Sequence, residues 1–291
     1  MQLGRLGVWT WLDHLPAAEA TAFALRAERW GYAALWIPEA VGRDPFALLG
    51  FLAGRTSRIA LATGIANIYA RDAIAMRAGR DTVAELSGGR FVLGLGVSHA
   101  PMVSALRGHE YRRPVETMRG YLEAMEKAPF VGAAPPEPAP VVLAALGPRM
   151  LELAARSARG AHPYNVTPEH TARARAILGR PAWLCPEQKV LLETDASKAR
   201  AAARVALRFY TGLPNYRNNW KRLGFGEADL AGEGSDRFID AMVAWGDERA
   251  IRARIQAHFD AGADHVCIQP LRADGAMGPD ERVLELLAPG S

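Results

Sequence analysis

The chain has 291 residues, 49% of them hydrophobic, and its 35 Lys and Arg residues exceed its 31 Asp and Glu residues, giving a net charge of +4. Because the basic residues are scattered and form no run, this charge does not indicate a nucleic-acid partner. No stretch reaches the roughly 18 apolar residues of a membrane span, and the first residues lack the layout of a signal peptide, so we expect a cytoplasmic protein without a membrane partner.

Short apolar runs typical of β-strands alternate with amphipathic runs typical of helices along the whole chain. Strands are expected at residues 3–9, 34–38, 59–65, 91–96, 141–145, 160–164, 182–193 and 265–270, and the strand within 182–193 is expected to kink near Pro186. Helices are expected at residues 16–30, 46–55, 74–86, 114–127, 148–158, 167–178, 195–210 and 280–287. Further helices and loops are expected in a segment at about 211–262.

This alternation predicts an α/β fold with a parallel sheet. Most of the strands are continuous apolar runs, so both faces of the sheet are expected to be buried. Eight strand–helix units most simply close into a (β/α)8 TIM barrel. We therefore expect a single barrel domain over residues 1–291, with a helical insertion between the seventh and eighth strands. An open doubly wound sheet is the alternative.

Aromatic and hydrogen-bonding residues follow the expected strands, and in a barrel the chemistry lies at the carboxyl ends of the strands. Such a mixture suits a flat aromatic ligand with polar edges. We expect a substrate to contact Trp9, Trp11 and Trp36, near the strands, and Tyr216, in the insertion. Large aromatic residues beside strands are as often plain core, which is the alternative interpretation.

Three residues near strand ends are candidates for acid–base catalysis. Glu39 would need a pKa raised by burial, and its alternative is an ion pair with Arg43 or another arginine. His99 is a ring contact or proton relay, or else a hydrogen-bonded structural residue. His14 faces the substrate or lies on the surface.

The turn Gly147-Pro148-Arg149-Met150 joins a strand to a helix. Pro148 suits the first helical position, and the free backbone N–H groups there, with Arg149, predict a phosphate site. The alternative is a tight turn with a solvated arginine. The two cysteines, Cys185 and Cys267, lie far apart in the sequence and form no metal motif, so we expect no metal.

Taken together, these motifs resemble the luciferase-like monooxygenase superfamily of flavin- and deazaflavin (F420)-dependent oxidoreductases, and most of all its F420-dependent class. The stretches that carry the resemblance are YAALWIPEAVGRDPF (32–46), LATGIANIYARDA (61–73), GGRFVLGLGVSHAP (88–101), LAALGPRML (143–151), GAHPYNVTPEHT (160–171), GLPNYRNNWKRLGF (212–225) and AGADHVCIQPL (261–271). They cover nearly the whole chain in order.

The resemblance implies a cofactor lying across the strand ends. It implies a non-prolyl cis peptide at Gly64-Ile65, followed by Ala66 and Asn67, beneath the cofactor ring. It places Ser98 or His99 at the polar edge of that ring. It also implies a phosphate held by Gly147, Pro148, Arg149 and Met150, with His162, Pro163 and Tyr164 near the phosphate or tail.

One departure concerns the proton donor. Many F420 reductases carry an acid–histidine pair after the second strand, whereas this chain has Glu39 followed by Ala40. Glu39, His14, His99 or water would then supply a proton.

The resemblance therefore implies an F420-dependent oxidoreductase that transfers a hydride between the deazaflavin and a small organic substrate, acting as a homodimer. The alternatives are an FMN-dependent monooxygenase that uses O2 and a non-catalytic cofactor-binding barrel.

Overall fold

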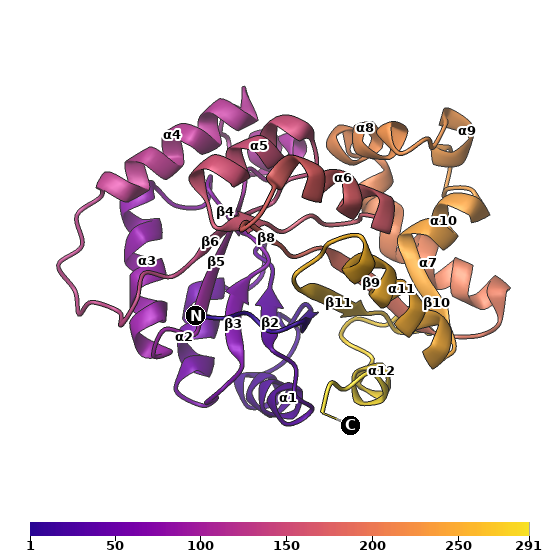
Figure 1. Ribbon diagram of the computed structural model, residues 1–291, viewed down its shortest axis with the longest axis horizontal. Coiled ribbons are helices and arrows are strands. Elements are labelled where there is room, and N and C mark those ends of the chain that lie inside the picture. The colour runs from indigo at the N-terminus through magenta and orange to yellow at the C-terminus, as the bar shows by residue number, and fades with distance from the viewer. Residues whose placement is uncertain (291) are drawn as a thin grey trace.

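Parallel strands form one curled sheet, and helices lie along its outer face (Figure 1). The structure is a computed structural model and describes residues 1–290. The strands are β1 (Leu6–Trp9), β2 (Ala34–Ile37), β3 (Ala60–Thr63), β4 (Ala66–Asn67), β5 (Phe91–Gly96), β6 (Val141–Leu143), β7 (Gly160–Ala161), β8 (Trp183–Leu184), β9 (Glu187–Leu192), β10 (Val243–Gly246) and β11 (Val266–Pro270).

Apart from the π-helix at Met102–Leu106, which was not expected, the helices lie in the connections where the sequence predicts helices. They are α1 (Ala17–Arg29), α2 (Pro45–Ala53), α3 (Ala73–Leu86), the π-helix η1 (Met102–Leu106), α4 (Pro114–Lys127), α5 (Pro148–Ser157), α6 (Pro168–Leu178), α7 (Ala196–Thr211), α8 (Pro214–Arg222), α9 (Glu227–Leu230), α10 (Asp236–Met242), α11 (Glu248–Asp260) and α12 (Glu281–Leu286). Several begin at predicted caps, as where the Thr167 hydroxyl accepts a hydrogen bond from the His170 N–H.

The strand order is β10-β9-β11-β1-β2-β3-β5-β6-β7-β8, with β4 paired to β5. The predicted parallel α/β class is confirmed. The expected closed ring of eight strands is not observed as such, because the path is open and ends at β10 and β8.

The departure from a closed ring occurs at Pro186. The expected strand 182–193 is divided there into β8, which pairs with β7, and β9, which pairs with β10 and β11. Proline has no N–H to donate to a ladder, although the Pro186 carbonyl still accepts a hydrogen bond from the Cys267 N–H. The carboxyl half of the strand therefore turns away from β7 and pairs with β10 instead.

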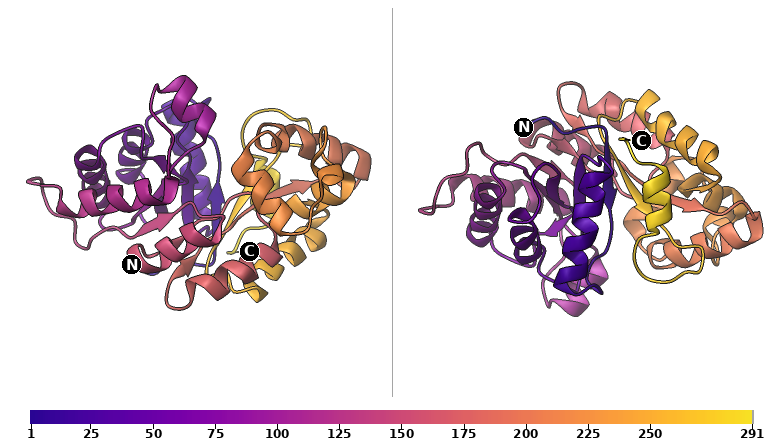
Figure 2. Two further views of the ribbon diagram at one scale, coloured as in Figure 1. Left: turned by 90° about the horizontal axis from the view of Figure 1, so that it is seen from above. Right: turned by 90° about the horizontal axis from the view of Figure 1, so that it is seen from below.

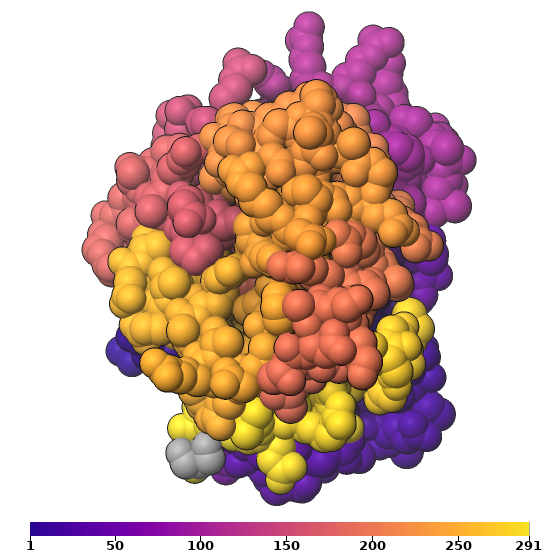
Figure 3. All heavy atoms as spheres, turned by 90° about the vertical axis from the view of Figure 1, so that its right-hand side faces the viewer, coloured from indigo at the N-terminus to yellow at the C-terminus, as the bar shows by residue number. Residues whose placement is uncertain are grey.

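The segment at 211–262 contains more than helices and loops. Helices α8 to α10 are followed directly by β10 and then by α11. The apolar run that forms β10 starts where α10 ends, with no turn residue between them, which is why the sequence pattern missed this strand. Seen from the side in Figure 3, residues 214–242 in orange cover the upper part of that face.

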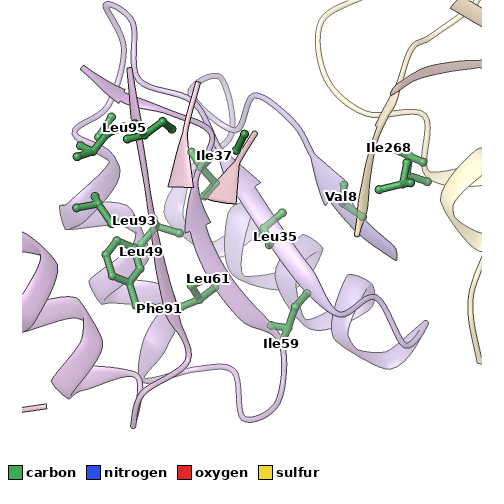
Figure 4. Close-up of a cluster of buried hydrophobic side chains, with 14 of the residues drawn as sticks. Val8, Leu35, Ile37, Leu49, Ile59, Leu61, Phe91, Leu93, Leu95 and Ile268 are labelled. Atoms are coloured by element: carbon green, nitrogen blue, oxygen red, sulfur yellow. The ribbon is translucent and has the colours of Figure 1, made fainter. Parts of the chain in front are cut away.

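Alternation along each strand separates two layers of buried side chains. On β2, Leu35 and Ile37 point outward to the helices, whereas Ala34 and Trp36 point into the curl of the sheet. The outer layer includes the side chains labelled in Figure 4: Val8, Leu35, Ile37, Leu49, Ile59, Leu61, Phe91, Leu93, Leu95 and Ile268. A third cluster, built on α7, α8 and α10, includes Leu207, Tyr216, Trp220 and Phe238.

The first and last strand–helix units of the chain are neighbours. β1 pairs with β11, and α1 and α12 lie side by side (Figure 2, right). Tyr32 after α1 donates a hydrogen bond of 2.7 Å to the Leu284 carbonyl of α12. The opposite edge, where the strands end, is thereby left to the loops that form the site.

Candidate active site

A cavity of about 740 Å³ opens at the carboxyl ends of the strands. Its size lies within the range of cofactor and small-molecule sites. The loops after β1, β2, β3, β5, β6 and β7 line it, together with α7 and α8. The sheet therefore places the cavity where a parallel α/β fold is expected to bind ligands.

Most of the predicted site residues line this cavity. They are Trp9, Trp11, Glu39, Gly64, Ile65, Asn67, Ser98, His99, Gly147, Pro148, Arg149, Met150, His162, Tyr164 and Tyr216.

Four predicted residues do not line the cavity. His14 is exposed beside Gly278, and Trp36 lies a layer deeper, where its Nε1–H donates to His265 Nε2 at 3.1 Å. Ala66 packs in the outer layer because alternation along β4 turns it away from Asn67. Pro163 contributes its carbonyl to the Glu187 N–H. For His14 and Trp36 the structure agrees with the alternatives left open by the sequence, the surface and the core, and for Ala66 and Pro163 it corrects the expectation.

The turn between β3 and β4 forms the floor of the cavity, and its Gly64-Ile65 peptide is cis, as the resemblance implied. The Gly64 carbonyl accepts a hydrogen bond of 2.7 Å from the Trp9 indole. A Cβ on Gly64 would lie 2.6 Å from that indole nitrogen, so only glycine fits there. The residue type thus follows from the close approach of Trp9.

Glu39 forms an ion pair with Arg71, which occupies both oxygens of its carboxylate. Its two carboxylate oxygens accept hydrogen bonds from Arg71 at 2.9 and 2.5 Å, and Oε2 also accepts the Asn67 N–H at 2.7 Å. Burial alone would lower the pKa of Arg71, but Glu39 and Asp44 raise it above the ordinary arginine value. The partner is Arg71 and not Arg43. This geometry favours a structural role, in which Glu39 fixes the turn that carries Asn67.

His99 lies just after β5, and its ring contacts the rings of Phe209 and Tyr216, which in turn contact Tyr210. We call these four residues, His99, Phe209, Tyr210 and Tyr216, the aromatic wall. Burial lowers the pKa of His99 below 6.5, and a hydrogen bond with Asn215 opposes that shift. Its Nδ1 is sealed from solvent and has no partner within residues 1–290. His99 is therefore a neutral wall residue with one inaccessible nitrogen.

His162 lies in the floor, with its ring stacked on Trp36 at 4.6 Å between centroids. Its Nδ1 lies 2.7 Å from the Cys185 carbonyl, which can only accept, so Nδ1 carries the proton. Burial lowers the pKa of His162 to about 4, so the ring is neutral near pH 7. A neutral imidazole is a poor phosphate ligand, and this placement favours a role in packing the floor.

Tyr164 joins the floor to the aromatic wall. Its hydroxyl donates to Gln269 Oε1 at 2.9 Å, so the 3.1 Å contact with the Tyr210 hydroxyl must be donated by Tyr210. Burial raises the pKa of Tyr164 well above its ordinary value. Tyr216, 5.2 Å from Tyr210 between centroids, makes no such bond.

A buried ion pair beneath Tyr164 escaped the sequence analysis. Glu187 and Lys189 are both 1% exposed, with a 3.2 Å separation between Oε1 and Nζ. Lys189 Nζ also donates to Asn165 Oδ1 at 2.6 Å and lies 4.0 Å from the centroid of the Tyr164 ring. The signal was present in the sequence: two opposite charges two residues apart in one strand share a face.

The far end of the cavity is electropositive. α5 begins at Pro148, and the residue before it, Gly147, is the N-cap and has no side chain that could cap the helix. Arg149 and Arg222 line the cavity here, and neither forms an ion pair with a carboxylate in the described chain. Helix N-termini and guanidinium groups both attract anions, so this end is suited to a phosphate.

Two absences concern the described chain. Nowhere in residues 1–290 do three His, Cys, Asp or Glu side chains gather as a metal would require. Over the same residues, no helix combines the length and the apolar character needed to cross a bilayer.

Known proteins resemble this chain over nearly its full length. A 5,10-methylenetetrahydromethanopterin reductase of Methanolobus tindarius is 28% identical, over 94% of this chain and 95% of its own. An F420-dependent secondary alcohol dehydrogenase, solved with an F420–acetone adduct, has a TM-score of 0.78 at 13% identity, covering 99% of this chain and 98% of that one. The FMN-bound oxygenating constituent of 3,6-diketocamphane monooxygenase from Pseudomonas putida has a TM-score of 0.72 at 15% identity, covering 98% and 97%.

The two structural likenesses are of fold. The sequence model of the luciferase-like monooxygenases matches residues 3–265, most of the chain. The protein therefore belongs to the luciferase-like monooxygenase family of oxidoreductases.

Proposed function

We propose that this protein is an F420-dependent oxidoreductase that transfers a hydride between the deazaflavin and a small organic substrate. The observation that carries the proposal is the shape and charge of the cavity. It has a floor at Gly64-Ile65, an aromatic wall and an electropositive end at Arg149 and Arg222. A cofactor with a flat ring and an anionic tail would fit this cavity, with the ring between the floor and the aromatic wall and the tail at the electropositive end.

The residues present suit such a group. The Gly64-Ile65 turn and the Ile65 side chain would lie against the ring, with Ser98 at its polar edge. The start of α5, with Arg149 and Arg222, would hold the phosphate. When bound, the cofactor supplies the hydride chemistry, and the protein supplies orientation and electrostatics.

The protein's own residues determine what surrounds the reacting atoms. Trp9 fixes the Gly64 carbonyl, and the Glu39–Arg71 pair fixes the turn at Asn67. The aromatic wall gives the opposite side of the cavity an apolar lining, and a ligand that displaces water from it would strengthen the electrostatic interactions inside the cavity. Trp9, Glu39 and Arg71 therefore bind and orient, and none of them exchanges a proton or an electron pair with the substrate.

The cofactor is identified by titrating the protein with F420 and with FMN and following the fluorescence quenching of each. We expect tighter binding of F420, because its tail carries carboxylates in addition to the phosphate and two unpaired guanidinium groups face that end. Tighter binding of FMN would favour the second candidate, a flavin-dependent monooxygenase using O2. The likeness in fold to the FMN-bound diketocamphane enzyme supports that candidate.

If neither cofactor binds, both candidates fail and a non-catalytic barrel is the better description. The homodimer and the cytoplasmic location stay predictions. Light scattering coupled to size-exclusion chromatography tests the first of these.

A further inference from the structure

Few side chains that line the cavity are able to donate a proton to a bound substrate. If the proposed function is right, reduction of a C=O group needs a hydride on carbon and a proton on oxygen. The titratable side chains that line the cavity are Glu39, His99, Arg107, Tyr111, Arg149, His162, Tyr164, Tyr210, Tyr216 and Arg222. Arginine is not deprotonated in proteins, which leaves seven candidates.

Glu39 and the two histidines are unsuited to the task. Both oxygens of Glu39 accept hydrogen bonds from Arg71. His162 donates its single proton to the Cys185 carbonyl, and its Nε2 is sealed from solvent. Burial lowers the pKa of His99, so the ring holds a single proton, and its Nδ1 is sealed in the same way.

Three of the four tyrosines already donate within the protein. Tyr164 donates to Gln269, Tyr210 donates to Tyr164, and Tyr111 faces the Ser98 carbonyl at 3.5 Å. Giving up any of these protons to a ligand would leave a partly buried acceptor unpaired.

Tyr216 is the remaining group. Its hydroxyl makes no hydrogen bond within residues 1–290, yet it is not among the sealed polar atoms, so it is accessible from the cavity. Its ring is 5% exposed and stacks on Trp220 at 5.7 Å between centroids. Trp220 is in turn anchored by its Nε1–H to the Asn165 carbonyl at 3.1 Å. The hydroxyl is therefore held in place by a fixed ring.

We propose that the Tyr216 hydroxyl binds the carbonyl oxygen of an apolar ketone and supplies the proton when that ketone is reduced. His99, Phe209 and Tyr210 give the surroundings an aromatic, apolar character, so the ligand that fits has an apolar body and one acceptor oxygen. This inference rests on the proposed function and names its substrate class and proton donor.

Reduction of the ketone adds a hydride to its carbon and a proton to its oxygen. The C=O π bond breaks, the carbon gains a hydride with its electron pair from a reduced deazaflavin, and the oxygen gains the Tyr216 proton. The phenolate then regains a proton from water at the mouth of the cavity. Burial keeps the pKa of Tyr216 well above its ordinary value, so the hydroxyl is protonated before each turnover.

The test compares two ligands of one shape, acetophenone and α-methylstyrene, in which a C=CH2 group replaces the C=O group. Each is titrated calorimetrically into the cofactor-loaded protein and into the cofactor-free protein. A hydrogen bond to Tyr216 should make acetophenone bind about 2- to 12-fold more tightly than α-methylstyrene. In Tyr216→Phe that preference should disappear through weaker acetophenone binding alone.

Tyr210→Phe is the matched control, because it removes a hydroxyl from the same wall whose proton is already committed to Tyr164. It should retain the preference. The ¹³C=O stretch of bound labelled acetophenone should lie lower in the wild type than in Tyr216→Phe, which a merely structural role would not produce. Single-turnover reduction of acetophenone by reduced F420 should slow in Tyr216→Phe more than binding weakens.

Retention of the preference in Tyr216→Phe overturns the proposal, as does a wild type that does not distinguish the two ligands. Loss of the preference in His99→Phe but not in Tyr216→Phe assigns the contact to His99 and also overturns it. Because the ligand pair is titrated with and without cofactor, failure to bind F420 sinks the proposed function while the result on Tyr216 still stands.

Discussion

Arg71, in the loop before α3, donates one hydrogen bond to each oxygen of the Glu39 carboxylate. Its Nη2 also donates to Asp44 Oδ2 at 2.8 Å. Glu39 is 7% exposed at its side chain and Arg71 is 14% exposed. The backbone N–H of Glu39 also donates to the Ile65 carbonyl at 3.2 Å. The residue therefore holds the turn at the cavity floor from two sides.

Removing the Glu39 carboxylate should lower the stability of the protein more than it lowers the rate of turnover. We expect Glu39→Ala to lower the free energy of unfolding by about 3 kcal/mol. The substitution leaves the mostly buried guanidinium of Arg71 with Asp44 as its remaining carboxylate partner, which compensates its charge only in part. Glu39→Gln should lose less, because its carbonyl oxygen still accepts one bond. Urea unfolding measures both. Full stability with abolished turnover in Glu39→Gln would instead identify Glu39 as an acid–base residue.

The Glu187–Lys189 pair should behave as a unit. Lys189→Met leaves a carboxylate uncompensated in the interior, where burial already raises the pKa of Glu187, and we expect a loss of about 3–5 kcal/mol. The double variant with Glu187→Gln should recover most of that loss. Equal losses in the single and double variants, measured by denaturant unfolding, would contradict this coupling.

Glu28 should make stability depend on acid pH. Burial opposes its ionisation, but the N–H groups of Arg58, Ile59 and Ser57 and the Ser57 hydroxyl lower its pKa from 4.5 to about 2. A carboxyl whose pKa is lower in the folded state stabilises the protein above pH 4.5 and loses that contribution as the pH falls towards 2. The amount is on the order of 3 kcal/mol. Glu28→Gln should be less stable at neutral pH and lack this portion of the pH dependence in unfolding curves.

The two glycines of β5 should differ in their tolerance of alanine. A Cβ on Gly94 would lie 2.1 Å from the backbone carbonyl oxygen of Thr63, whereas one on Gly96 would lie 2.4 Å from Cδ1 of the Ile65 side chain. Backbone cannot yield as a side chain can, so we expect Gly94→Ala to cost about 3 kcal/mol and Gly96→Ala about 1 kcal/mol. Gly96→Ala should still weaken cofactor binding, because Ile65 must move. Thermal unfolding with a binding titration separates the two effects.

Arg149 should act on a phosphate and on nothing else. We expect Arg149→Ala to weaken FMN binding about tenfold, the loss typical of one hydrogen bond to a charged group. Riboflavin has the same ring without the phosphate and should bind the variant and the wild type alike. A parallel loss for riboflavin would show that Arg149 contacts another part of the ligand or supports the loop. The FMN effect should shrink as salt is added.

Much of the fold was readable because period-2 and period-3.6 patterns report burial directly. Helices such as α3 and α5 were located to within a residue, since their caps and apolar stripes coincide. The sequence indicated a kink near Pro186, but it did not indicate which neighbour each half of the strand pairs with, because distant residues decide that pairing. β10 was missed for a related reason, as nothing in the sequence marks the end of α10.

The sequence predicted the backbone turns that line the cavity. It did not predict which side chains from distant parts of the chain pair with one another. The turn at Gly64-Ile65 and the start of α5 lie where the strand-end motifs predicted. The capture of Glu39 by Arg71, 32 residues later, depends on how α3 docks. For Trp36 the sequence left a substrate contact and the core as alternatives, because alternation alone does not tell how far a strand extends towards the cavity.

The cluster on α7, α8 and α10 has its own hydrophobic interior, distinct from the two layers around the sheet. Tyr216 and Phe209 reach the cavity from this part, whereas Gly64, Ile65 and Glu39 belong to the sheet and its turns. Tyr164 packs against both sides, so it is substitutions away from Tyr164 that reshape one side and leave the packing of the other largely undisturbed. A lineage with this architecture is free to change which molecules it accepts while keeping the same redox partner, because selection acts on the two sides separately.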